Sequence, residues 1–238
     1  MLTSKSPGFI FKCLSFLLIA MLAGDAGHCR TEAADTKDDD SFVSFPANQK
    51  RALNKHARAF VKNYIASNRS DLNAIRKRSR IPFSIIDSVF TRYGLPTQLK
   101  YLAVIESDLK TKAVSRVGAK GPWQLMAPTA QILGLKITHK RDERTGYDKS
   151  TAAAARYLKD LYAEFGDWLL VLAAYNGGPG PVHHAIRMAG SNNFWALQYY
   201  LPAESRTHVK RFIATEYYFE GQDKSTTASF SSSDFRYL

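Results

Sequence analysis

"TQLKYLAVIES", residues 97 to 107, places a run of apolar side chains directly before a single carboxylate. A helix that is apolar on nearly every side is typical of an element buried in the centre of a domain. Pro96 can begin this element, because proline is tolerated in a first helical turn. The stretch therefore predicts a buried central helix that ends at Glu106, where the chain leaves the hydrophobic core.

The sequence around this stretch predicts further short helices. "PTAQILG" ends at Gly134, and "KSTAAAARYLKDLYAEFG" has Ser150 as its expected N-cap and Gly166 as its end. Asp167 then begins another apolar helix, "DWLLVLAAYNGG". No run of β-branched residues alternates with period two for long enough to demand a sheet. We therefore expect an all-α domain over residues 95–221.

Other segments differ from this domain in composition. Residues 49–94 are basic with apolar residues at helical spacing, which predicts a short helical N-terminal extension. Residues 29–48 contain an acidic run and predict a flexible linker, and the Ser/Thr-rich residues 222–238 predict a flexible tail.

The chain carries a large positive charge and begins like an exported protein. Its 238 residues have a formal net charge of +12, which favours a polyanionic partner: nucleic acid, an anionic membrane face or an acidic wall polymer. Lys5 and Lys12 precede the uncharged stretch 13–23, which is shorter than the about 20 residues of a membrane-spanning helix. This layout predicts a signal peptide over residues 1–28, cleaved near Ala26 or Gly27, rather than a buried N-terminal helix. Export to the periplasm or cell envelope makes nucleic acid an unfavoured partner.

Cysteine and histidine spacing gives no support for a disulfide framework or a metal site. The two cysteines are Cys13 and Cys29, and none of the six histidines forms a His-x-x-x-His pair. Lipid attachment at Cys29 would bring the protein to a membrane, but the residues before Cys29 do not match such a site, so a lipoprotein is the less favoured alternative.

Glu106 has the setting of a general acid. Burial disfavours the charged form of a carboxyl group, and an acid that stays protonated near neutral pH can protonate a glycosidic oxygen. The alternatives are a glutamate in solvent, or one paired with Arg116 or Lys120. Downstream, Gly118 and Gly121 permit positive φ and a close approach of backbone to a ligand, as in a groove wall.

Three motifs resemble the soluble-lytic-transglycosylase (SLT) domain family, glycoside hydrolase family 23. They are "YLAVIESDLKTKAVSRVGAKGPWQLMAPTA" (101–130), "AAYNGGPGPV" (173–182) and "LPAESR" (201–206), in the family's order. The resemblance, strongest to the branch of membrane-bound lytic murein transglycosylases, implies a lysozyme-like (goose-type) helical fold.

The resemblance also implies roles for matched positions. Glu106 would be the catalytic acid and base, and Ser115 would lie near the acyl-amino group of the cleaved sugar, or else serve only as a turn or cap serine. Tyr175 matches a tyrosine that contacts the catalytic carboxyl, with Asn176 beside it in the substrate site.

Four further positions have a groove role and a simpler alternative. Gln124 and Met126 match side chains that line the sugar groove, although Met126 fits core packing nearly as well. Trp123 fits stacking on a sugar and core packing equally. Glu204 matches a second acidic residue of the cleft, or forms a surface salt bridge with Arg206.

The sequence departs from the family pattern at a few places. Pro122 replaces a common aliphatic residue, and His208 stands where the family usually has a tyrosine. Neither is expected to touch Glu106, so we expect them to change groove shape rather than activity.

The implied activity is non-hydrolytic cleavage of the MurNAc-β-1,4-GlcNAc bond in peptidoglycan glycan strands, giving 1,6-anhydroMurNAc ends. No cofactor or metal is expected, because the motif supplies one carboxylate and the sugar supplies its own nucleophile. We also expect a monomer. The alternatives are a goose-type lysozyme-like hydrolase, with Asp108 or Asp142 positioning water, and an inactive wall-binding protein.

Overall fold

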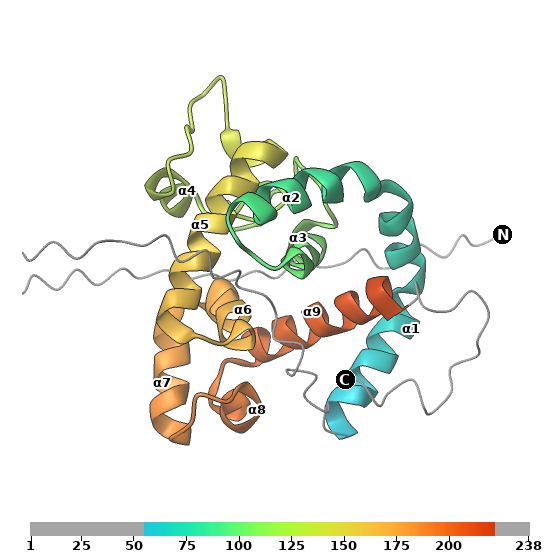
Figure 1. The fold of residues 1–238 in the computed structure, drawn as a ribbon, viewed down its shortest axis with the longest axis vertical. Helices are drawn as coiled ribbons and strands as arrows, with labels where there is room; N and C mark the ends of the chain where they lie inside the picture. The colour runs from blue at the N-terminus through green and yellow to red at the C-terminus, as the bar shows by residue number, and fades with distance from the viewer. Residues whose placement is uncertain (1–54, 222–238) are drawn as a thin grey trace, which may run out of the picture.

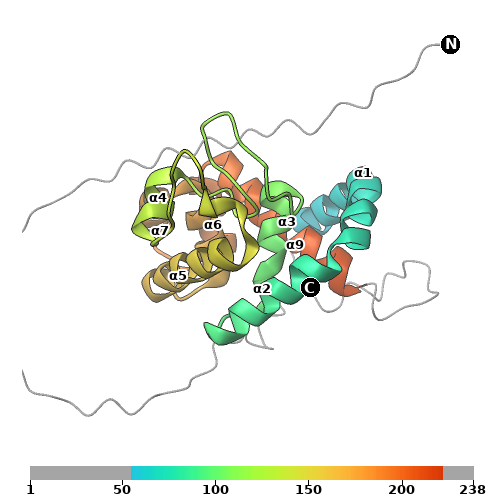
Figure 2. The ribbon, with the colours of Figure 1, turned by 90° about the horizontal axis from the view of Figure 1, so that it is seen from above.

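Helix α3 (Lys100–Ser107) lies at the centre of the molecule, between α2 (Arg80–Arg92) and α9 (Ala203–Gly221). Every residue of α3 after Lys100 is buried. The prediction of a buried central helix is confirmed, and the helix continues one residue beyond Glu106. The computed structural model describes residues 55–221, and their helices surround α3 in Figures 1 and 2.

The predicted all-α architecture is confirmed for the described residues. The remaining elements are α1 (Lys55–Arg78), η1 (Thr97–Leu99), α4 (Ala127–Ile132), η2 (Glu143–Thr145), α5 (Tyr147–Phe165), α6 (Trp168–Gly177), α7 (Pro179–Ala189), α8 (Phe194–Leu197) and η3 (Gln198–Tyr200). Within residues 55–221 there is no β-strand, and extended pairing is confined to isolated bridges such as Val114 with Lys120 and Ile137 with Asp142.

Helix α1 packs against α9, and the two helices lie next to each other in both ribbon views (Figures 1 and 2). Its buried residues Val61, Ile65, Leu72 and Ile75 recur at helical spacing and join the same hydrophobic cluster as α3. Arg76, in the last turn of α1, donates hydrogen bonds to the carbonyls of Tyr218 and Phe219 near the end of α9, at 2.8 and 2.9 Å. These bonds hold the two helices together at carbonyls that lack an intrahelical partner.

Helix caps confirm one sequence prediction and correct another. Asp167 caps α6, and its Oδ1 accepts hydrogen bonds from the backbone N–H groups of Leu169 and Leu170 at 2.9 and 3.2 Å. Ser150 is not an N-cap: α5 begins at Tyr147, and the Ser150 hydroxyl donates to the Gly146 carbonyl one turn earlier, at 2.6 Å. A serine inside a helix can satisfy its hydroxyl in this way, so its presence did not mark the start.

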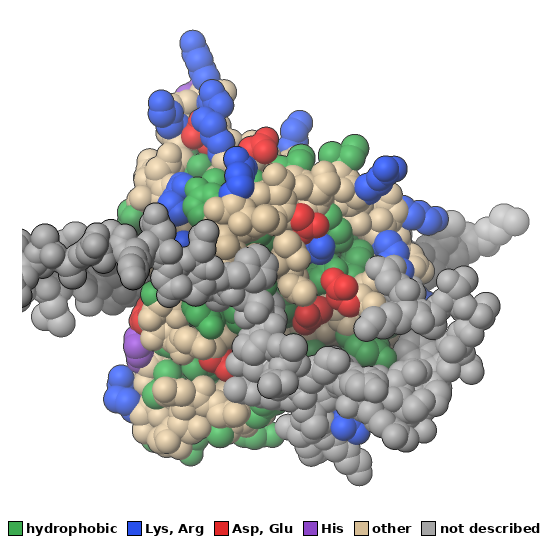
Figure 3. All heavy atoms as spheres, in the orientation of Figure 1, with side chains coloured by type: hydrophobic (Ala, Val, Ile, Leu, Met, Phe, Trp, Pro, Cys, Tyr) green, Lys and Arg blue, Asp and Glu red, His purple; other side chains and the backbone are tan. Residues whose placement is uncertain are grey.

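Lys and Arg side chains project from the upper part of the face drawn in Figure 3.

Within residues 55–221, no helix combines the length and apolar character required to cross a bilayer. The predicted signal peptide, linker, tail and Cys29 all lie outside the described residues.

Candidate active site

Glu106 is the next-to-last residue of α3 and is 5 % exposed. The helix ends because Asp108 adopts a left-handed conformation, with φ 54°, while its N–H still donates to the Val104 carbonyl at 2.8 Å. Glu106 is therefore buried rather than solvated. Its alternative partner Lys120 instead pairs with Asp142 at 3.1 Å.

The residue that meets Glu106 is His208 of α9. The His208 Nε2 atom lies 2.9 Å from Glu106 Oε1, and the histidine is 4 % exposed. The expectation that His208 does not touch Glu106 is wrong, because α9 packs directly on α3 and brings together residues that are 102 positions apart. The second ring nitrogen, Nδ1, is buried without a hydrogen-bond partner.

Residues on both sides of His208 hold α9 in place. Ser205 donates its hydroxyl proton to Asn176 Oδ1 at 3.0 Å, which joins α9 to the end of α6. Arg211 donates from Nη2 to the Ile105 carbonyl at 2.9 Å, which joins α9 to α3. Sequence reasoning missed Ser205, although its spacing of three from His208 places both on one helix face.

Tyr175, at the end of α6, binds the loop that follows α3. Its hydroxyl donates to the Trp123 carbonyl at 2.7 Å, and its ring packs against Tyr157 with centroids 5.5 Å apart. The contact between Tyr175 and the carboxyl of Glu106 stays a prediction.

Gly118 and Gly121 have the predicted positive φ, at 85° and 82°. The close approach at Gly121 is made by the protein itself, since a Cβ there would lie 1.9 Å from the Arg144 carbonyl oxygen. The expectation that a ligand approaches the backbone at Gly121 is therefore wrong, because the Arg144 carbonyl occupies that position. No heavy atom lies within 4 Å of a Cβ built at Gly118.

Two predicted substrate-binding residues also fold this loop. The Ser115 hydroxyl accepts from the Ala119 N–H at 3.0 Å, which is the turn role considered above. Gln124 is buried at a φ of 46° and donates from its amide to the Gly121 carbonyl at 2.9 Å. Their contacts with a sugar stay predictions.

Trp123 is a core residue, which rules out stacking on a sugar. It is fully buried, packs on Phe90 with centroids 5.4 Å apart, and donates from Nε1 to the Thr151 hydroxyl at 3.0 Å. Met126, directly before α4, remains partly exposed, so its side chain is not simply core packing.

Asp142 is bound within a cluster of cations. It accepts hydrogen bonds from the guanidinium of Arg144 at 2.8 and 3.0 Å, while Arg144 Nη1 also donates to the carbonyls of Gly118 and Leu125. Arg144, and then Lys120, hold the pKa of Asp142 well below its usual range although partial burial opposes them. Asp142 therefore stabilises the loop after α3 through Arg144, which binds two carbonyls of that loop.

Of the other carboxylates considered from the sequence, Asp108 is half-buried and Glu204 is exposed. Asp108 pairs with Lys110 at 2.9 Å. Glu204 is exposed in the first turn of α9, and the described residues show no ion pair between it and Arg206. Arg206 instead donates to the carbonyls of nearby Tyr199 and Leu201.

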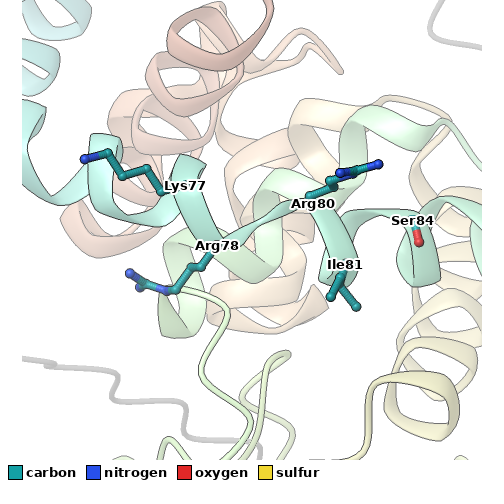
Figure 4. Close-up of a pocket in the computed structure, with 5 residues that line it drawn as sticks. All are labelled: Lys77, Arg78, Arg80, Ile81 and Ser84. Carbon is teal, nitrogen blue, oxygen red and sulfur yellow. The ribbon is translucent and has the colours of Figure 1, made fainter.

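A separate pocket of about 800 Å³ lies where α1 meets α2 (Figure 4). It is lined by Lys77, Arg78, Arg80, Ile81 and Ser84. Lys77 and Arg80 extend to opposite sides in Figure 4, so these cations do not converge on one point. None of the site residues predicted from the sequence lines this pocket.

Part of the chain matches a known family model. Residues 85–198 match the model of the family described as "Transglycosylase SLT domain". The match includes Glu106 but ends before α9, so His208 lies beyond it.

Two relatives share the sequence in part. The chain is 34 % identical over 152 residues to the membrane-bound lytic murein transglycosylase D of Escherichia coli K12, covering 62 % of this chain and 33 % of the relative. It is 31 % identical over 117 residues to the peptidoglycan transglycosylase gp16 of phage T7, covering 48 % of this chain and 9 % of the relative. The chain thus spans about a third of the length of the Escherichia coli relative.

Solved structures show the same fold. An inactive mutant of the lytic transglycosylase Slt of Pseudomonas aeruginosa superposes with a TM-score of 0.52 at 22 % identity, covering 63 % of this chain and 26 % of that chain. The 70-kDa soluble lytic transglycosylase of Escherichia coli gives 0.50 at 25 % identity, with 60 % and 26 % covered. The lysozyme-like fold expected from the motifs is confirmed by these neighbours.

Proposed function

We propose that the protein is a lytic transglycosylase acting on the glycan strands of peptidoglycan, on the premise that residues 85–198 match the family model of the transglycosylase SLT domain. The observation that carries the proposal is the buried carboxyl of Glu106 at the end of the central helix, within the family match. A carboxyl group in such a setting can hold a proton and release it to a glycosidic oxygen.

Glu106 acts twice in the proposed reaction. It first protonates the oxygen that leaves with GlcNAc, as the C1–O bond of MurNAc breaks and C1 becomes oxocarbenium-like. The resulting carboxylate then takes the proton of the MurNAc C6 hydroxyl, whose oxygen bonds to C1. The product is a 1,6-anhydroMurNAc end, and Glu106 recovers its proton.

The engagement of the other carboxylates favours this route over hydrolysis. Glycosidases that use water or a covalent intermediate usually need a second carboxylate near the scissile bond. Asp142 is held by Arg144 and Lys120, and Asp108 pairs with Lys110 on the surface. An internal C6 hydroxyl removes the need for a second carboxylate.

Within the described residues, further side chains support a sugar groove at the same place. Tyr175 and Asn176 lie at the end of α6, and Gln124 and Met126 lie in the loop after α3. Trp123 links the two regions, because its carbonyl accepts the Tyr175 hydroxyl proton. We assign Ser115, Gln124, Met126, Tyr175, Asn176 and Glu204 to glycan binding.

The test is digestion of purified murein sacculi, borohydride treatment and mass spectrometry of the products. We expect anhydro ends that borohydride leaves unchanged and that are one water lighter than hydrolysed ends. Reducible ends as the main product would identify a hydrolase instead.

Glu106→Gln tests the proposed acid, because glutamine keeps the shape but has no proton to transfer. General acid–base catalysis contributes typically 10²–10⁴-fold, so we expect at least a hundredfold loss of anhydro product with the fold retained. Glu164→Gln is the matched control, since Glu164 also contacts a histidine, His183, but on the surface. A Glu106→Gln variant with more than half the wild-type rate would eliminate Glu106 as the acid.

The proposed place of action is the cell envelope, where peptidoglycan lies. N-terminal sequencing of the mature protein should show cleavage near Ala26 or Gly27. Fatty-acid labelling that depends on Cys29 would instead identify a lipoprotein, and an uncleaved cytoplasmic protein would contradict export.

A further inference from the structure

We propose that His208 is a positioning residue that determines which oxygen of Glu106 carries the catalytic proton. The inference rests on the proposed function and extends it to a residue where this chain departs from the family pattern. It starts from the 2.9 Å contact between His208 Nε2 and Glu106 Oε1, with both side chains nearly excluded from solvent.

The position of the imidazole is set by its neighbours on α9. Ser205 and Arg211 lie three residues before and three residues after His208, and each binds another element. Ser205 bonds to α6 through Asn176, and Arg211 bonds to the carbonyl next to Glu106 on α3. The helix segment that carries His208 is thereby fixed against the two helices that bear Tyr175 and Glu106.

The unpartnered Nδ1 atom identifies the tautomer. A proton on Nδ1 would be a buried N–H without an acceptor, and such orphaned donors are rare in folded proteins. A proton on Nε2 points at Glu106 and makes a hydrogen bond. Of the two neutral tautomers, the one with its proton on Nε2 therefore fits this environment.

This tautomer divides the work between the two carboxyl oxygens. Oε1 accepts the Nε2–H bond, so the proton of the neutral acid sits on Oε2. Oε2 gives that proton to the leaving oxygen and later receives the C6 hydroxyl proton, while the Nε2 proton remains on His208 throughout. Hydrogen bonds to a charged acceptor are stronger than those to a neutral one, so His208 stabilises the carboxylate that forms as the glycosidic bond breaks.

Two amide substitutions separate this role from simple packing. In His208→Gln, the side-chain NH₂ can reach the place of Nε2 and still donate to Oε1. In His208→Asn, the NH₂ group is near the place of Nδ1 and falls short of Glu106. We expect His208→Gln to lower kcat by less than about fivefold and His208→Asn to lower it by about 10- to 100-fold, because misplacement of a catalytic group by 1 Å can cost about 10²-fold. KM should change less than about threefold in both variants.

His208→Phe and His183→Asn complete the set. His208→Phe keeps an aromatic ring without a donor, so its kcat should match that of His208→Asn. His183→Asn alters the exposed histidine paired with Glu164, so its kcat should match that of the wild type. Circular dichroism and thermal melting establish that each variant is folded. If His208→Phe does not fold, the comparison of Gln with Asn still decides the matter.

The tautomer has its own readout in the nitrogen chemical shifts of ¹⁵N-labelled full-length protein. We expect the His208 signal of a neutral ring protonated at Nε2, and a ring protonated at Nδ1 overturns the inference. Equal kcat for the Gln and Asn variants, or a rise in KM without loss of kcat, also overturns it. If the wild type releases no anhydro ends, the proposed function itself fails; if it does and His208→Asn keeps full kcat, only the role of His208 fails.

Discussion

Replacing Gly121 by alanine tests whether the loop after α3 is held against the Arg144 backbone. The new Cβ would lie 1.9 Å from the Arg144 oxygen, and reaching the 3.0 Å limit of real contacts requires a movement of about 1.1 Å. Arg144 resists that movement, because its guanidinium is bound to Asp142 and to the carbonyls of Gly118 and Leu125.

Gly118→Ala is the matched control. Its φ of 85° equals that of Gly121 within a few degrees, but no atom lies within 4 Å of its Cβ. An alanine at positive φ costs about 1–2 kcal/mol. Overpacking against a fixed neighbour adds typically about 1–3 kcal/mol. We therefore expect losses of about 1–2 kcal/mol for Gly118→Ala and about 2–5 kcal/mol for Gly121→Ala.

Urea unfolding of the full chain, followed by tryptophan fluorescence, measures both losses. With a slope of roughly 2 kcal/mol per molar urea, the midpoint should fall by about 0.5–1 M for Gly118→Ala and further, by about 1–2.5 M, for Gly121→Ala. Equal losses in the two variants would refute the reasoning, since only the clash with Arg144 distinguishes them.

Two further substitutions test the electrostatics of the fold. Asp142→Asn should cost about 3–5 kcal/mol in urea unfolding, because it leaves the buried Arg144 without its carboxylate. The wild type should lose stability as pH falls through the low pKa of Asp142, and the Asp142→Asn variant should not show this loss. A stable Asp142→Asn protein would argue against a bracing role. Burial, and then Glu220, raise the pKa of Glu216 to about 7, so the fold should lose stability as pH rises from about 4.5 towards 7. Glu216→Gln should therefore raise the melting temperature more at pH 8 than at pH 5, and the free energy of unfolding should rise by roughly 1–3 kcal/mol at pH 8. Equal gains at both pH values would contradict this.

The sequence predicted the elements whose signals are local. Residues 101–107 are apolar on nearly every side, so the burial of α3 and the position of Glu106 could be inferred before any fold was known. Asp167 was identifiable as a cap because its carboxylate bonds to N–H groups only two and three residues away. Ser150 was misassigned because a serine hydroxyl can serve equally well at a helix start or against a carbonyl one turn back.

Tertiary structure decided which distant residues meet. The sequence marked His208 as a departure from a family pattern but placed it away from Glu106, and only the packing of α9 on α3 brings the two within hydrogen-bond distance. The same holds for Gly121, whose positive φ was predictable but whose neighbour, the Arg144 carbonyl, belongs to η2, 23 residues later. Helical periodicity and capping are properties of adjacent residues, so a sequence reports them directly. Contacts across the core depend on how whole helices pack, and no local pattern encodes that.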